Sequence, residues 1–282
     1  MTEPNRKSGA DAPIETSAEP LDHRDDGGGD VAGMADMAGA TADDDGTPPA
    51  EHREPGYRNK AWLQAALVTG VTGAAVTHAF RIERAGFARM LPTIGIAYLV
   101  MLVGAWRFAA ARGELREQFA PRRLDLTMGA LVAGVLYLIT NLVPTFVLQG
   151  RPEESWLWRL YVQLGEAKAV APPYIGVAVL VIAAIEEIVW RGWVMRALRV
   201  AHGARTALVA TTLLYGLAHV GTMVSLHIPG TRPNPLLVVA ALGCGFVWGA
   251  MALRFERLGP SIFAHALFSW SVALFPMWRG KL

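Results

Sequence analysis

Two adjacent glutamates, Glu186 and Glu187, lie in a hydrophobic stretch of the chain, and Arg191 follows four residues after the second of them. The twelve residues before the pair, 174–185, carry no charge. A carboxylate at the middle of a membrane-spanning helix costs roughly 2.5 kcal/mol or more, so such residues are retained mainly where they form a site. The glutamate pair is therefore the first candidate for chemistry.

Two histidines lie in later apolar runs. His219 ends the run 213–219, and His265 lies in the run 262–269, four residues before Ser269. These groups would lack hydrogen-bond partners if they faced lipid, so we expect them to point into the protein and to meet one another or water. The chain thus places acid and base groups on three separate apolar segments.

Helix geometry predicts different roles for the two glutamates. Adjacent helical residues point about 100° apart, so Glu186 and Glu187 cannot face the same spot. Glu187 and Arg191 are four residues apart and can pair on one helix face. That pairing leaves Glu186 free to act on water as a general base.

The remaining groups fit the hydrolysis of a peptide bond. His219 can hold the same water or a metal ion, and His265 and Ser269 can donate hydrogen bonds to a developing oxyanion. No serine lies in a recognisable nucleophile motif, and the HExxH motif is absent. A serine triad and a soluble zinc protease of the HExxH type therefore have no support.

Three motifs in this order, on successive apolar segments, resemble those of the CPBP family, which comprises CAAX prenyl endopeptidases of the Rce1 type and their bacterial Abi-like relatives. The resemblance covers about residues 174–273. It implies an intramembrane endopeptidase that cuts near the C-terminus of a membrane-anchored protein, either prenylated or carrying a transmembrane tail. The motifs are Glu186-Glu187-x-x-x-Arg191, Tyr215-x-x-x-His219 and the pattern from His265 to Ser269.

The resemblance also implies a role for each position. Glu186 matches the glutamate that activates the hydrolytic water, and His219 matches the histidine that helps to hold it. His265 matches the histidine of the oxyanion site. Glu187 and Arg191 match the supporting part of the first motif.

Two positions depart from the family pattern, which commonly has Phe at Tyr215 and Asn at Ser269. A serine hydroxyl can still donate a hydrogen bond, although it is shorter than an amide. We expect a mechanism without a metal or another cofactor. The alternative is a zinc ion held by Glu186, His219 and His265.

The elements that position these groups are apolar runs of about twenty residues, the length that crosses a bilayer as a helix. The runs are continuous and do not alternate, which excludes a β-barrel pattern. The sequence therefore predicts an all-α, polytopic membrane helix bundle with about seven transmembrane helices. The expected spans are 61–80, 89–110, 126–149, 174–195, 206–225, 235–253 and 260–278.

The N-terminal segment differs in composition from the rest of the chain. Residues 1–54 hold fourteen acidic and four basic residues, and the first aromatic residue is Tyr57. Such a segment cannot bury enough apolar area to fold. We predict a disordered acidic tail over 1–56, with no secretory signal, and a membrane-embedded protease domain over 57–282. The distribution of Lys and Arg favours a cytoplasmic N-terminus.

Three smaller features of the sequence also support predictions. The aromatic residues of 151–173, chiefly Trp156, Trp158 and Tyr161, are expected at the membrane interface, and the alternative is a lid. The pattern Gly245-x-x-x-Gly249 indicates close helix packing, within the monomer or between subunits. The single cysteine, Cys244, excludes an intrachain disulfide and is expected to serve packing.

Two other function classes stay open. Intramembrane Glu, His and Arg are typical of proton-coupled transporters, although the chain shows no internal repeat of the kind that transporters carry. A non-catalytic scaffold or self-immunity protein would use the same groups as a buried network that fixes helix register. The expected partners of the leading hypothesis are a membrane-anchored protein substrate and the lipid bilayer, with no nucleic acid.

Overall fold

The computed structural model describes residues 55–164, 173–275 and 277. Every regular element in these ranges is helical, which confirms the all-α prediction. The predicted tail over 1–56 lies outside the described residues except for Pro55 and Gly56, which begin the first helix.

Eleven α-helices follow one another in the described ranges. Two of them continue without a break into wider π-helical turns, over Pro144–Leu148 and Ile188–Met195. The helices are α1 (Pro55–Ala79), α2 (Phe87–Ala111), α3 (Leu115–Phe119), α4 (Asp125–Val143), α5 (Ser155–Leu164), α6 (Pro173–Glu187), α7 (Arg196–His202), α8 (Ala204–Ala218), α9 (Thr222–Ser225), α10 (Leu236–Phe255) and α11 (Gly259–Leu274).

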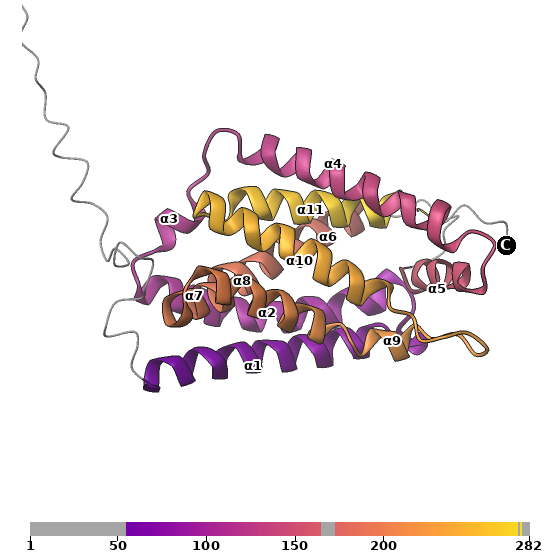
Figure 1. Ribbon diagram of the computed structural model, residues 1–282, viewed down its shortest axis with the longest axis horizontal. Helices are drawn as coiled ribbons and strands as arrows, with labels where there is room; N and C mark the ends of the chain where they lie inside the picture. Colours follow the sequence, from indigo (N-terminus) through magenta and orange to yellow (C-terminus); the bar gives the residue numbers. More distant parts are fainter. Residues whose placement is uncertain (1–54, 165–172, 276, 278–282) are drawn as a thin grey trace, which may run out of the picture. The chain divides into compact units, whose positions relative to one another are not determined.

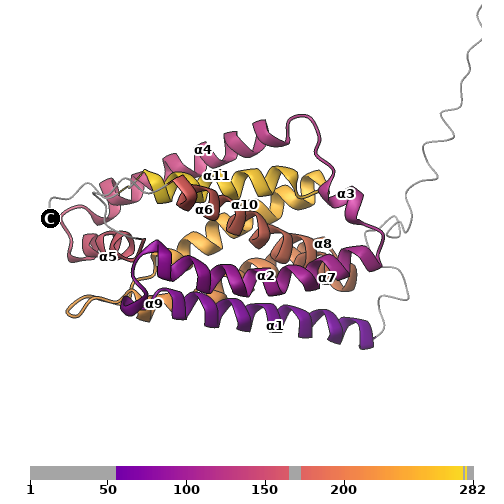
Figure 2. The same cartoon turned by 180° about the vertical axis from the view of Figure 1, so that it is seen from behind.

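The long helices pack side by side around α6 and the π-helical segment that follows it (Figure 1). Helix α11 lies against α4 and α6, α10 lies against α8, and α1 lies against α2 and α8. Figures 1 and 2 both place α3, α7 and the start of α1 at one end of this bundle, and α5 and α9 at the other. These are called the α3 end and the α5 end below.

Many of the outward-facing side chains are apolar, as a lipid environment requires. Leu63, Leu138, Phe146 and Val224 are each more than half exposed. Among the described residues, four helical segments are long and apolar enough to cross a membrane: Phe87–Ala111, Asp125–Leu148, Ala204–Ser225 and Leu236–Phe255. They coincide with four of the seven predicted spans, so the chain is an integral membrane protein, while the count of seven stays a prediction.

The three other predicted spans are helical but have distinct properties. Polar residues such as Gln64, Thr69 and Thr72 punctuate α1. The span 174–195 falls on α6 and the π-helical segment that carry the candidate site. Helix α11 has 16 residues, which gives a length of about 24 Å, less than the roughly 30 Å of a bilayer core.

The two glycines of the predicted packing motif lie where α10 meets the segments beside it. A Cβ atom at Gly245 would come within 2.9 Å of the Tyr215 ring, and one at Gly249 within 2.7 Å of the Leu208 side chain. Both neighbours belong to α8. The pattern therefore serves packing within the monomer.

The aromatic residues of α5 behave differently from the prediction of an interfacial anchor. Trp156 and Tyr161 are buried, and only Trp158 is partly exposed. The Trp156 indole donates a hydrogen bond to the carbonyl of Arg232, and the Tyr161 hydroxyl donates one to the carbonyl of Val272. Trp156 and Tyr161 thus fasten α5 to its neighbours, because the protein itself satisfies their polar atoms.

Candidate active site

A cavity of about 240 Å³ lies among α2, α6, α8, α10 and α11. Glu186, His219, His265 and Ser269 all line it. The three apolar segments that carry these residues pack together around α6, so groups far apart in the sequence meet here. Most of the remaining lining is apolar, which keeps the polar groups in a partly dry environment.

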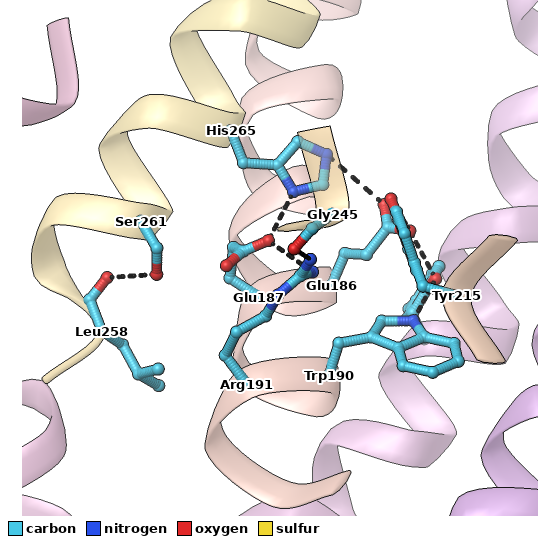
Figure 3. Close-up of polar contacts among 10 residues, drawn as sticks. Glu186, Glu187, Trp190, Arg191, Tyr215, Gly245, Leu258, Ser261 and His265 are labelled. Carbon is cyan, nitrogen blue, oxygen red and sulfur yellow. Dashed lines mark hydrogen bonds and ion pairs between the residues drawn. The ribbon is translucent and has the colours of Figure 1, made fainter. Parts of the chain in front are cut away.

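Glu187 and Arg191 lie behind this cavity wall and form the predicted ion pair. Arg191 Nη1 donates to Glu187 Oε1 over 2.9 Å, and both side chains are fully buried. Arg191 Nη2 also donates to the carbonyl of Gly245 over 2.8 Å (Figure 3). This pair therefore ties the π-helical segment to α10.

The Arg191 guanidinium lies between two aromatic rings. Its central carbon is 5.0 Å from the centre of the Tyr215 ring and 5.6 Å from that of Trp248. A cation over an aromatic face is attracted by the ring quadrupole, more strongly where water is excluded. The charge of Arg191 is thus stabilised from three sides.

His265 connects the buried ion pair to the cavity. Its Nδ1 lies 2.9 Å from Glu187 Oε1, and because a carboxylate only accepts, Nδ1 carries the proton. Its ring stacks on Trp248 with centres 3.7 Å apart and planes 17° apart. Figure 3 shows the other nitrogen, Nε2, turned toward Glu186, whose Oε2 is 3.8 Å away.

Two tyrosine hydroxyls hold Glu186. Tyr98 from α2 donates to Glu186 Oε1 over 2.7 Å, and Tyr215 from α8 donates to the same oxygen over 2.9 Å. The Trp190 indole in turn donates to the Tyr98 hydroxyl over 3.2 Å. Oε1 is therefore occupied, and Oε2 is the oxygen that faces His265.

His219 presents one nitrogen to the cavity. Its Nδ1 lies 2.8 Å from the carbonyl of Tyr215, so Nδ1 is the protonated nitrogen and Nε2 keeps a lone pair. The ring also packs edge-on against Tyr215, with centres 4.8 Å apart. His219 is the C-cap residue of α8, and it lines the cavity.

No metal-binding group of three His, Cys, Asp or Glu side chains occurs in residues 55–164 and 173–275. The set Glu186, His219 and His265, considered above as possible zinc ligands, shares one cavity without forming such a group. In both histidines Nδ1 already meets another acceptor, so only Nε2 of each would be available to a metal ion.

Sequence reasoning missed two residues of the site. Tyr98 is the only tyrosine of the predicted span 89–110. A hydroxyl in the middle of an apolar run needs a hydrogen-bond partner inside the protein, and this requirement could have identified Tyr98. No comparable feature of the sequence points to Trp248, because an aromatic residue in an apolar run usually serves packing. Cys244 is buried as expected, yet it also lines the cavity.

Comparison with known proteins bears on the same part of the chain. Residues 168–271 match the family model described as Type II CAAX prenyl endopeptidase Rce1-like. The matched range includes all six predicted site residues and excludes Tyr98. Neither the curated proteins nor the solved structures gave a match. Over residues 168–271 the chain is therefore similar to the Rce1-like family of type II CAAX prenyl endopeptidases.

Proposed function

We propose that this protein is an intramembrane endopeptidase that hydrolyses a peptide bond near the C-terminus of a membrane-anchored protein, with Glu186 as the general base. One observation carries the proposal. Glu186, His219 and His265 line a single cavity, and Glu186 has one oxygen fixed by two hydroxyl groups while the other faces His265.

The proposed reaction begins with a water molecule between Glu186 Oε2 and the lone pair of His219 Nε2. Glu186 removes a proton from this water as its oxygen attacks the carbonyl carbon of the substrate. The carbonyl oxygen becomes an oxyanion in the tetrahedral intermediate. When the C–N bond breaks, Glu186 returns the proton to the leaving nitrogen, so that the products are a carboxylic acid and an amine.

His265 is the proposed donor to the oxyanion. With Nδ1 held by Glu187, an Nε2–H directed into the cavity can stabilise the negative charge that forms in the transition state. This role requires a proton on His265 Nε2 as well as on Nδ1 when the oxyanion forms. Glu187 and Arg191 thus act as positioning residues that fix the imidazole.

Ser269 is the proposed second donor. It lies on the same face of α11 as His265, four residues later, and lines the same cavity. Its hydroxyl is shorter than the amide that the family commonly has, so its contribution is expected to be smaller than that of His265. The mechanism uses no metal ion, and this independence stays a prediction.

The test is cleavage by the purified full-length protein with Glu186→Gln. Loss of a general base lowers the rate by about 10²–10⁴-fold, whereas Glu256→Gln, at a site whose side chain is 65% exposed, should leave it unchanged. Full cleavage by Glu186→Gln would refute the assignment. Incubation of the wild type with a chelator tests the metal prediction, because zinc-dependent cleavage would then be lost.

The same experiment addresses the other function classes. A transporter or a scaffold would show no cleavage in the wild type under any condition. The cavity also ends at the site, since Trp190, Val194 and Leu198, which follow on the α3 side, are fully buried. A closed end of this kind suits a reaction site better than a transport path.

A further inference from the structure

The cavity extends from the candidate site in one direction only. Beyond Glu186 and His265 its walls come from the last residues of α1, the first half of α2, α5 and the first residues of α10. Val76, Phe87, Leu160 and Leu237 are examples, one from each of these segments. All four segments meet at the α5 end of the bundle (Figure 1).

Packed side chains separate the site from the pockets that lie at the α3 end. Trp190, Val194 and Leu198 are each completely buried there. Trp193 fills the space beside Gly104, because a Cβ atom at that glycine would come within 2.7 Å of the indole ring. A substrate therefore reaches Glu186 from the α5 end.

The two ends of the bundle differ in charge. At the α3 end, the segments 55–60, 107–123, 196–205 and 254–257 hold twelve Lys and Arg residues. At the α5 end, the described segments 81–89 and 151–159 together with Arg232 hold six. One of the six, Arg159, is buried and bonds Gln163 and the carbonyl of Ser225, so it serves the fold.

Short segments that flank membrane spans carry an excess of Lys and Arg on the cytoplasmic side. Applied to this bundle, the rule puts the α3 end in the cytoplasm. From the position of the cavity and this charge difference we propose that the active site opens to the extracytoplasmic side of the membrane. Its substrates are then exported, membrane-anchored proteins whose cleavable segment leaves the bilayer on that side.

This inference rests on the proposed protease function and narrows its substrate class. A lipid-modified tail of a cytoplasmic protein would approach the bilayer from the α3 end, where the packed residues around Trp190 close the way to Glu186. An exported protein with a C-terminal transmembrane anchor meets the open end instead. The apolar cavity wall fits the end of such an anchor, since it offers few polar groups to bind a hydrophilic tail.

Orientation is tested by cysteine labelling in a Cys244→Ala background, which has no other cysteine. Ile82→Cys and Pro229→Cys report on the α5 end, and Asn59→Cys and Ala204→Cys report on the α3 end. The four positions are exposed and uncharged, so the substitutions leave the charge distribution intact. A membrane-impermeant maleimide should label the first two in intact cells and the other two only after permeabilisation. The reverse pattern would overturn the proposal.

The substrate class is tested separately by membrane proteomics of cells that express the wild type or Glu186→Gln. C-terminal peptides that survive only with Glu186→Gln should come from extracytoplasmic tails. Retained tails that all lie in the cytoplasm would refute the inference while supporting the protease function. If no C-terminal tail differs between the two strains and the labelling is as expected, the protease function is refuted and the orientation stands, because the labelling does not depend on cleavage.

Discussion

The buried pair of Glu187 and Arg191 predicts a large loss of stability when one partner alone is removed. Both side chains are fully buried, and Arg191 also donates to the carbonyl of Gly245. Arg191→Met keeps much of the side-chain volume but leaves the Glu187 carboxylate without its counter-charge. Breaking a buried ion pair in this way costs about 3–5 kcal/mol.

An exposed pair in the same chain supplies the matched control. Arg199 and Glu256 are 2.9 Å apart, but their side chains are 38% and 65% exposed. Water screens such a pair, so its net contribution is about 0–1 kcal/mol. Arg199→Met should therefore change the free energy of unfolding several-fold less than Arg191→Met does.

The assay is denaturant titration of the full-length protein in mixed micelles, with a double-mutant cycle. Glu187→Gln added to Arg191→Met should restore part of the lost stability, because a neutral amide no longer needs a counter-charge and can still accept from His265. The reasoning would be refuted if Arg191→Met were no more costly than Arg199→Met. It would fail equally if the two substitutions at the buried pair were simply additive.

Two further predictions concern a hydroxyl and a glycine. Tyr98→Phe removes a hydrogen bond to a charged acceptor, worth about 1.5–3 kcal/mol, so kcat should fall about tenfold or more with KM unchanged. The control is Tyr137→Phe, whose hydroxyl donates to the carbonyl of Phe275 away from the site; it should keep the wild-type kcat. Equal losses would contradict the role of Tyr98. Gly129→Ala would drive a Cβ atom into Phe263 and should lower the free energy of unfolding by about 1–3 kcal/mol. Gly134→Ala on the same helix meets open space and should be neutral or stabilising. Similar unfolding free energies for the two variants would contradict the packing of α4 on α11.

The site was more predictable than the arrangement around it. The energetic cost of Glu187 and Arg191 in an apolar run, together with their spacing, was enough to predict an ion pair that the structure contains. The spacing of His265 from Ser269 likewise put both on one face of α11. These predictions depend on one helix at a time, where periodicity is informative.

The periodicity of a single helix does not predict contacts between distant segments. Tyr98 meets Glu186 across 88 positions of sequence, and no local pattern links them. The burial of Trp156 and Tyr161 was also missed, because composition alone does not distinguish an aromatic residue that faces headgroups from one that faces a neighbouring helix. The number of membrane spans is hard to predict from composition for a similar reason, since α11 is short and α1 is interrupted by polar residues.

The π-helical turns over Ile188–Met195 have a consequence for insertions and deletions in this gene segment. The widened turns accommodate more residues than α-helical turns do, and such turns often occur at functional sites. A one-residue change within a regular α-helix rotates everything beyond it by about 100°. Deleting one residue from the widened turns would instead let the segment relax to an α-helix, so that α7 keeps nearly the same direction. A single-residue deletion beyond Arg191 in this segment should therefore be tolerated better than one within α10 or α11.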